Sequence, residues 1–201
     1  MTDIAGATLP ADAQAVLDFW FAAKGEADHG AVRDLWFRKS DANDRQIAER
    51  FGPLIEQALR GELDGWAAQP DSALAQIVLL DQFTRNSFRD TPRAFAGDKR
   101  ALAAAMAMVG SRHDENLLPV QRVFVYLPFE HAEGIGMQDE ALRLFTRLVA
   151  SAPEMHDMLD HAQRHHAIVK RFGRFPHRNV ILGRHSTAEE VAFLKEPGSR
   201  F

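Results

Sequence analysis

Asp81, Gln82, Arg85 and Asn86 are polar residues within a strongly apolar segment, ALAQIVLLDQFTRNSF (residues 73–88). Apolar residues lie on every side of the helix predicted here, and such a helix is usually buried. Asp81 and Arg85 are four residues apart, so their side chains share one face. Buried charged groups cost several kcal/mol unless they are paired and hydrogen-bonded. We therefore expect Asp81 and Arg85 to form a buried ion pair within one hydrogen-bond network.

A second concentration of polar residues is the string RFGRFPHRN (residues 171–179), which follows a predicted helix. Gly173 can adopt the left-handed conformation that ends a helix, and Pro176 favours an extended or turn conformation at Phe175. Arginine forks suit carboxylates and phosphates, so we predict an anion site here. Its candidate ligand-binding residues are Arg174, His177, Arg178, Asn179 and Arg184. Alternatively, these arginines cap the carbonyl groups at the end of the preceding helix.

The same region is basic although the chain carries a net charge of -4. Residues 161–188 contain no Asp or Glu, whereas the whole chain has 28 of them. One basic region on an acidic chain favours a local anion site over a nucleic-acid-binding surface. We expect a small anionic ligand or an acidic peptide terminus as partner, and no nucleic acid. The alternative is that these arginines pair with acidic residues elsewhere in the fold.

Acidic residues and histidines of other helices could perform acid–base chemistry. Glu130 and His131 follow the bend expected at Pro128, and His165 lies on the core-facing side of the helix predicted for residues 153–172. Asp81, Glu130 and His165 are therefore candidate general bases of an enzyme. The arginines would hold a carboxylate or phosphate of its substrate.

A metal site is a weaker alternative on the same helix. His161 and His165 are four residues apart and could bind a metal with Glu130 from another helix. However, the His-x-x-x-His spacing lacks the intervening glutamate of the zinc-protease motif and is common by chance. We therefore expect no metal site and leave any cofactor undefined.

The elements that hold these residues all have helical patterns, because no segment shows sustained alternation of apolar and polar residues. Helices are expected over about residues 11–23, 40–59, 73–88, 98–109, 119–133, 138–150, 153–172 and 186–195. We expect Gly52-Pro53 to kink or break the second of these helices, and Ser186 with Glu189 to cap the last. The predicted fold is a single all-α domain over residues 1–201, an antiparallel array of helical hairpins without a sheet.

Composition narrows the class of protein. A hydrophobic content of 46% is sufficient for a substantial core. No cationic leader or apolar run of about 18 residues indicates secretion or membrane insertion. The chain has no Cys, which excludes disulfides, thiolate metal sites and cysteine nucleophiles. We expect a cytoplasmic protein that does not bind membranes, and leave its oligomeric state open.

Four strings resemble one uncharacterised bacterial family, known as domain of unknown function 924. They are VLDFWF (16–21), LLDQFTRNSFR (79–89), VYLPFEHAE (125–133) and HHAIVKRFGRFPHRNVILGRHSTAEEVAFL (165–194). Thr84 stands where that family has a proline in LDQFPRN, which affects only the local helix geometry. The resemblance implies an all-helical, tetratricopeptide-like fold in a cytoplasmic protein, and no established activity.

Three functions are compatible with these residues. The first is binding of a small anion or acidic peptide terminus in a polar pocket. Its walls would be Asp81, Gln82, Arg85 and Asn86; Glu130 and His131; and His165 with residues 174–179. The second is an enzyme that uses Asp81, Glu130 or His165, and the third is a scaffold whose groove binds a partner helix. No nucleophile elbow, phosphate loop or dinucleotide-binding glycine pattern favours a named reaction.

Overall fold

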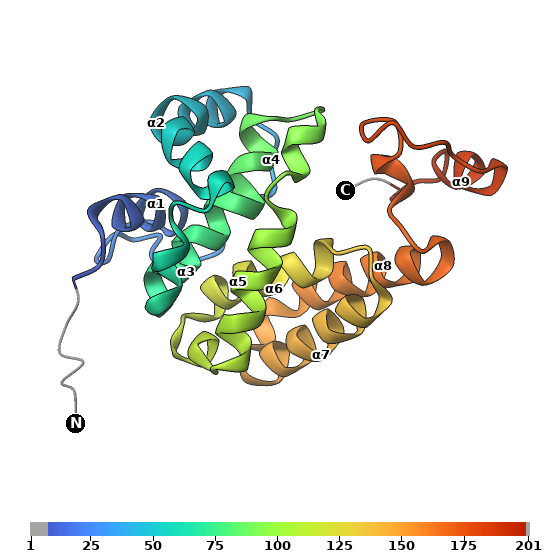
Figure 1. Cartoon of the computed structure of the whole chain (residues 1–201). Coiled ribbons are helices and arrows are strands. Elements are labelled where there is room, and N and C mark those ends of the chain that lie inside the picture. The colour runs from blue at the N-terminus through green and yellow to red at the C-terminus, as the bar shows by residue number, and fades with distance from the viewer. Residues whose placement is uncertain (1–7, 200–201) are drawn as a thin grey trace.

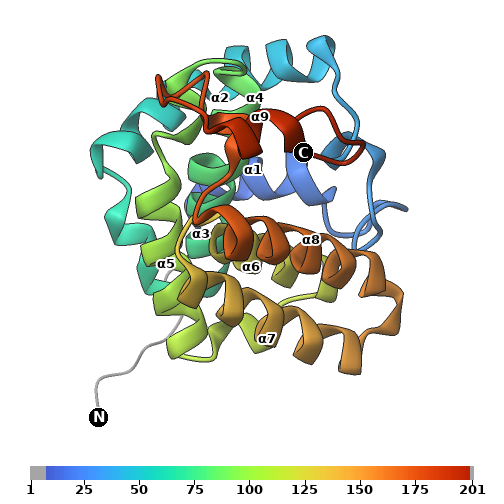
Figure 2. The same cartoon turned by 90° about the vertical axis from the view of Figure 1, so that its right-hand side faces the viewer.

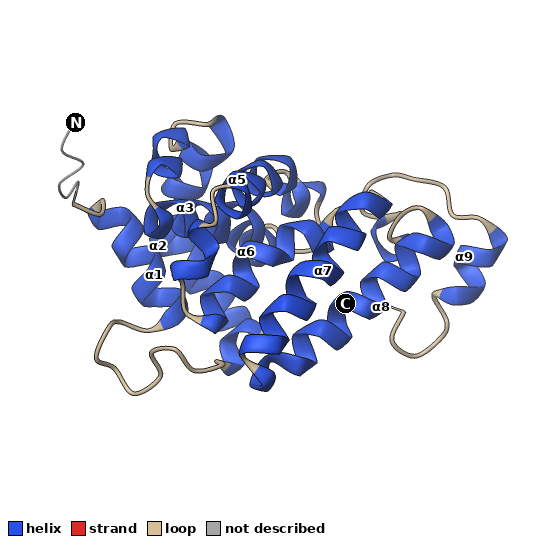
Figure 3. Ribbon diagram, turned by 90° about the horizontal axis from the view of Figure 1, so that it is seen from below, coloured by secondary structure: helices blue, strands red, loops and turns tan. Residues whose placement is uncertain are grey.

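The computed structural model describes residues 8–199 of the chain. Over that range the backbone forms helices and loops without a strand, so the predicted all-α class is confirmed (Figure 3). The α-helices are α1 (Ala11–Phe21), α2 (Asp41–Arg60), α3 (Pro70–Ile77), α4 (Thr84–Ser87), α5 (Asp98–Gly110), α6 (Pro119–His131), α7 (Ile135–Ser151), α8 (His156–Phe172) and α9 (Ala188–Phe193). None of the described helices is both long and apolar enough to cross a membrane.

Of the kink or break predicted at Gly52-Pro53, the break is excluded, because α2 is continuous over Asp41–Arg60. Ser40 caps the helix as expected, because its side chain accepts a hydrogen bond from the Asn43 backbone N–H at 3.3 Å. The helix then continues through Pro53 to Gly61, which ends it with a left-handed φ of 82°. Proline removes one backbone hydrogen bond, but tertiary packing supplies most of the stability of a helix in a protein. Phe51, on the turn before Pro53, is buried in the core.

The central helical segment contains a feature that the sequence did not predict. α3 continues into a π-helical segment, Val78–Phe83, which continues directly into α4. The wider hydrogen-bond spacing of a π-helix changes how side chains project, and such segments occur frequently at functional sites. Asp81 lies within this segment. Thr84, at the position of the expected proline, donates its hydroxyl to the Leu80 carbonyl at 2.8 Å. The side chain therefore donates to a carbonyl group within the π-helical segment.

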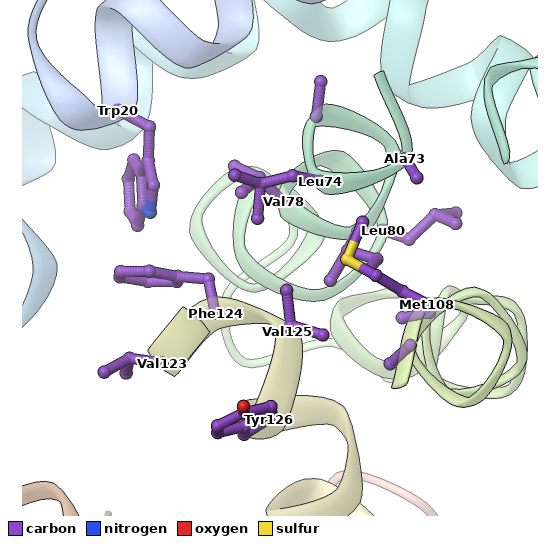
Figure 4. Packing of buried hydrophobic residues seen from close by; sticks show 14 of the residues in the cluster. Trp20, Ala73, Leu74, Val78, Leu80, Met108, Val123, Phe124, Val125 and Tyr126 are labelled. Carbon is purple, nitrogen blue, oxygen red and sulfur yellow. The ribbon is translucent and has the colours of Figure 1, made fainter. Parts of the chain in front are cut away.

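The central helix lies inside the molecule because other helices pack around it. α1, α2, α5 and α6 contact α3 or its π-helical and α4 continuations. Figure 4 shows Leu74 and Val78 near Trp20 and Phe124 in this core. Trp20 and Phe124 pack edge to face with ring centroids 5.6 Å apart. Nonpolar packing on all sides thus forces any polar side chain of the central helix to find partners inside the protein.

The C-terminal half adds successive helices to this core. α5 packs on α6, α6 on α7 and α7 on α8 (Figures 1 and 2). α7 begins at Ile135, one turn earlier than predicted, so Gly136 is helical. α8 ends at Gly173, which adopts the predicted left-handed conformation with a φ of 69°.

The final segment carries α9 beyond α8, and Phe175 belongs to the small apolar cluster that joins them. α9 is capped by Thr187 and Glu190, not by the predicted Ser186 and Glu189. The helix start is shifted because the Thr187 side chain accepts the Glu190 backbone N–H at 3.2 Å. Glu190 returns a contact to the Thr187 backbone N–H at 2.7 Å, which completes the capping box.

Candidate functional site

Asp81 is the most deeply buried charged residue of the site, with a side chain that is 1% exposed. Its Oδ1 atom lies 3.2 Å from Nη1 of Arg85, and Gln82 donates to its Oδ2 atom at 2.6 Å. Arg85 is 20% exposed and also donates to the Asp81 carbonyl at 2.7 Å. The predicted buried ion pair between Asp81 and Arg85 is therefore confirmed.

His131, at the C-terminal end of α6, is the second partner of Asp81. Its Nδ1 atom lies 2.8 Å from Oδ1 of Asp81. Burial alone would raise the pKa of Asp81, but the charge of Arg85 and the hydrogen bonds from His131 and Gln82 hold it well below its usual range. Burial lowers the pKa of His131, although Asp81 opposes this shift. At neutral pH we therefore assign an ionised Asp81 and a neutral His131 that donates its Nδ1 proton.

Arg85 also binds an acidic residue of another helix, Asp98 at the start of α5. Its Nη1 atom lies 2.9 Å from Oδ1 of Asp98. Gly97 makes this contact possible, because a Cβ atom at Gly97 would lie 2.1 Å from the carbonyl oxygen of Leu80. Only glycine permits so close an approach of α5 to the central helix.

Arg178 brings a second guanidinium to Asp98. It belongs to the Pro176–Arg178 turn and is 6% exposed. Its Nη1 atom donates to the His131 carbonyl at 3.0 Å and lies 3.6 Å from Oδ2 of Asp98. Burial, followed by the nearby charge of Arg85, lowers the pKa of Arg178 to about 10, so the group is still charged at neutral pH. Asp98 therefore bridges two mutually repelling cations.

We call Asp81, Arg85, Asp98, His131 and Arg178 the central cluster. Aromatic rings support both of its guanidinium groups. Arg178 lies over the rings of Phe175 and Phe95, at 4.5 and 4.9 Å from their centroids, and Arg85 lies 5.7 Å from the centroid of Phe95. These cation–π contacts hold the guanidinium planes in place without using their N–H donors.

Those donors are incompletely used. Nη2 of Arg85 and Nε of Arg178 are buried and have no hydrogen-bond acceptor within residues 8–199. A buried donor without an acceptor costs about 1–3 kcal/mol, and more when it is charged. Each of these two N–H groups is chemically suited to donate to an anionic oxygen.

Glu130 and His165 form a second carboxylate–histidine pair beside the central cluster. Nδ1 of His165 lies 2.9 Å from Oε1 of Glu130 and 2.9 Å from the His161 carbonyl. The His165 ring lies 6.3 Å from that of His131. The hydrogen bond of His161 to this pair is made by its backbone carbonyl. The described part of the chain contains no group of three or more His, Cys, Asp or Glu side chains that could hold a metal ion.

His177 approaches the cluster from the same turn as Arg178. Its ring packs 5.7 Å from that of Phe175. Burial, followed by the charge of Arg178, lowers the pKa of His177 to about 4. His177 is therefore neutral at physiological pH and adds no positive charge.

Three predicted ligand-binding residues are instead occupied by structural contacts. Arg174 forms a bidentate pair with Glu190, at 2.6 and 2.8 Å, and Asn179 donates to Ser186 and Glu190. Arg184 forms a bidentate pair with Glu133, at 2.6 and 2.9 Å. Glu133 also accepts the Phe175 backbone N–H at 2.8 Å. These contacts attach residues 174–184 to α6 and α9. Arg174 and Arg184 therefore pair with acidic residues elsewhere in the fold, as the alternative interpretation expected.

Asn86 also lies outside the central cluster. Its side chain donates to Asp44 of α2 at 2.8 Å, and Arg89 forms a bidentate pair with the same carboxylate. This interaction attaches α2 to the end of the central helix. The predicted first wall of the pocket thus retains Asp81, Gln82 and Arg85.

Sequence reasoning missed Asp98 and Phe95. Asp98 begins α5, and an acidic residue at a helix start is ordinarily explained by the helix dipole. The only local signal was Gly97 directly before Asp98, because a glycine at a helix start can mark a close backbone approach. Phe95 lies in a short 3-10 turn, Pro92–Phe95, and carries no recognisable pattern.

Two surface hollows lie away from the central cluster. One, of about 630 Å³, is lined by the Asp34–Trp36 turn and the start of α2. The other, of about 470 Å³, lies between α1 and α2 and is lined by Arg33 and Arg50 among others. Arg33 donates to the Phe19 and Trp20 carbonyls and Arg50 lies over Phe19, so both arginines have structural contacts. The central cluster, whose buried charged groups include unused donors, is therefore the better candidate for a functional site.

The chain is thus an all-helical protein with a buried cluster of paired charges at a π-helical segment. Its residues 16–198 match the family DUF924, described as a bacterial protein of unknown function, and the chain belongs to this family. No curated protein matches the sequence.

A solved structure has the same fold. It is a protein of unknown function from Agrobacterium tumefaciens that is 42% identical to this chain. The two superimpose with a TM-score of 0.80, over 91% of this chain and 96% of the Agrobacterium protein.

Proposed function

We propose that the protein binds a small anionic ligand, a carboxylate or phosphate, between Arg85 and Arg178. One observation carries this proposal. The two buried guanidinium groups share the carboxylate of Asp98, and each still has a buried N–H donor without an acceptor in the described range. An anion would supply those acceptors and reduce the repulsion between the two cations.

The formal charges of the cluster balance, so an anion would be held by the unused N–H donors and not by excess positive charge. Arg85 and Arg178 carry two positive charges, and Asp81 and Asp98 carry two negative ones. His131 is neutral. Because Asp81 and Asp98 approach mainly through Nη1 of Arg85, its Nη2 donor is left for a ligand. A peptide C-terminus also carries a carboxylate, so the same two arginines could bind it.

The test is a comparison of thermal stabilisation by sulfate and phosphate. A ligand that binds only the folded state stabilises it by RT ln(1 + [L]/Kd), about 1.4 kcal/mol at ten times Kd. For a chain of this size we expect a melting temperature about 3–5 °C higher. Sulfate also stabilises proteins by exclusion from their surface, so the informative quantity is the difference from a variant.

Arg178→Gln should lose the specific increment, and Arg143→Gln is the matched control. Arg143 is exposed on α7 and paired with Glu140, so its replacement removes the same charge far from the cluster. The proposal is contradicted if Arg178→Gln responds to sulfate and phosphate as the Arg143→Gln control does. If Arg178→Gln does not fold, Arg178→Lys keeps the charge but loses the fork, and should bind more weakly than wild type.

An enzyme is the second candidate, and the Asp81–His131 pair favours it. A neutral histidine whose Nδ1 proton is held by a buried carboxylate presents Nε2 as a base. We place the general base at His131, since Asp81 is covered by its partners and His165 is engaged by Glu130. An anionic substrate at Arg85 and Arg178 would lie beside it.

We keep the tetratricopeptide-like stacking and the single-domain organisation as predictions. Sequential packing of α5 to α8 supports the stacking, because each helix contacts the next along the chain. The scaffold alternative, a groove for a partner helix, has no comparable support from buried charges.

A further inference from the structure

We infer that the ligand is a short hydroxycarboxylate, whose carboxylate binds Arg85 and Arg178 and whose hydroxyl donates a hydrogen bond to Nε2 of His131. This inference rests on the proposed function, because it adds a second contact to the same anion site. It depends on three features: the tautomer of His131, the position of its ring and the charge around it.

Asp81 determines the tautomer of His131. An ionised carboxylate can only accept hydrogen bonds, so Nδ1 of His131 is the donor across the 2.8 Å contact. In a neutral imidazole the other nitrogen then carries a lone pair. Nε2 of His131 makes no hydrogen bond to any residue between 8 and 199. The His131 ring is 15% exposed, so this acceptor is not sealed by the core.

His131 is adjacent to both guanidinium groups. Nη1 of Arg178 donates to the His131 carbonyl at 3.0 Å. Nη1 of Arg85 lies 3.2 Å from the same Asp81 oxygen that contacts the His131 ring. The two guanidinium groups and the imidazole thus belong to one connected network, which the proposed ligand would span.

The local charge selects a hydroxyl over an ammonium group. Arg178 is buried beside a second cation, and burial followed by the charge of Arg85 lowers its pKa. An amino acid would add a third cation beside them, whereas a hydroxyl is a neutral donor. A carboxylate with a nearby hydroxyl therefore matches both the donors and the acceptor of the site.

The experiment is isothermal titration calorimetry of the wild-type protein with three pairs of acids: glycolate and acetate, lactate and propionate, and 3-hydroxybutyrate and butyrate. In each pair the acids differ by one hydroxyl. We expect at least one hydroxy acid to bind about fivefold more tightly than its partner, the typical value of one neutral hydrogen bond. Equal Kd values within all three pairs would overturn the inference but leave the anion site intact. If none of the six acids binds, and sulfate and phosphate also give no specific stabilisation, the proposed function fails as well.

His131→Asn provides the matched variant. Asparagine can keep an N–H donor near the position of Nδ1, facing Asp81, but has no atom at the position of Nε2. We expect the ratio of the two Kd values to fall to about one in this variant, whatever the substitution does to the binding of both acids. Retention of the advantage in His131→Asn would overturn the inference. If this variant does not fold, ¹⁵N spectra of wild-type His131 decide: the hydroxy acid should shift the Nε2 resonance and the partner acid should not.

Discussion

The Nδ1 nitrogen of His131 lies 2.8 Å from the Oδ1 oxygen of Asp81, although the two residues are 50 positions apart in the sequence. This contact joins the end of α6 to the π-helical segment of the central helix. Arg85 lowers the pKa of Asp81 and burial lowers that of His131, so the contact joins an ionised carboxylate to a neutral ring. Arg85 and Asp98 extend the same network to α5, and Arg178 extends it to the C-terminal segment.

The Asp81–Arg85 pair should show strong energetic coupling. We expect Asp81→Ala to destabilise the protein by about 3–5 kcal/mol, because it leaves Arg85 with less compensation for its burial. The double variant with Arg85→Leu should cost at least about 1 kcal/mol less than the sum of the single changes. Urea unfolding of the four proteins measures this coupling.

The control for that cycle is Asp34 and Arg38, which have the same spacing. Their ion pair is 3.1 Å long but both side chains are mostly exposed. We expect their coupling to be no more than about 0.5 kcal/mol. Equal coupling in the two cycles would show that burial does not strengthen the Asp81–Arg85 interaction.

Helical periodicity was sufficient to predict that Asp81 and Arg85 are buried together. It could not predict His131 or Asp98 as their partners, because those contacts depend on how α5 and α6 pack against the central helix. The π-helical segment was also missed, since its residues have an ordinary helical pattern. The loop arginines were overinterpreted: Arg174 and Arg184 each face a glutamate, and no sequence spacing connects them to it.

Gly97→Ala tests the close approach that positions Asp98. The new Cβ atom would lie 2.1 Å from the backbone oxygen of Leu80, and backbone atoms cannot move aside without shifting α5. We expect a loss of about 1–3 kcal/mol in the free energy of unfolding, typical of overpacking. Weaker anion binding should accompany this loss, because Asp98 and Arg85 separate.

Gly110→Ala is the matched control for Gly97→Ala. It lies at the other end of α5, and a Cβ atom there meets nothing within 4 Å. We expect it to change stability by less than about 1 kcal/mol. If the two substitutions have the same effect, the approach of Gly97 to Leu80 is not tight.

His177 predicts a loss of stability in mild acid. Its pKa is about 4 in the folded protein, whereas a histidine in an unfolded chain has a pKa of about 6.5. As the pH falls from about 6.5 to 4, the unfolded chain therefore binds a proton that the folded protein excludes. Stability falls over this window and the contribution is absent above it.

The measurement is the free energy of unfolding at several pH values between 7 and 4, for wild type and His177→Gln. The free energy of unfolding should depend less steeply on pH in the variant, because unfolding then takes up fewer protons, by up to one. Arg178→Gln should raise the pKa of His177 in an NMR titration, because it removes a neighbouring positive charge. Identical slopes for wild type and His177→Gln would show that His177 is not shielded from protonation.

Anion binding between Arg85 and Arg178 is tested most directly by a crystal structure of the protein soaked in selenate, a sulfate analogue whose selenium scatters anomalously. We predict an anomalous peak beside the two guanidinium groups, with selenate oxygens within hydrogen-bond distance of Nη2 of Arg85 and Nε of Arg178. The peak should disappear in Arg178→Gln crystals and persist in those of Arg143→Gln. Selenate bound only at other surface sites, with none beside Arg85 and Arg178, would contradict the proposal.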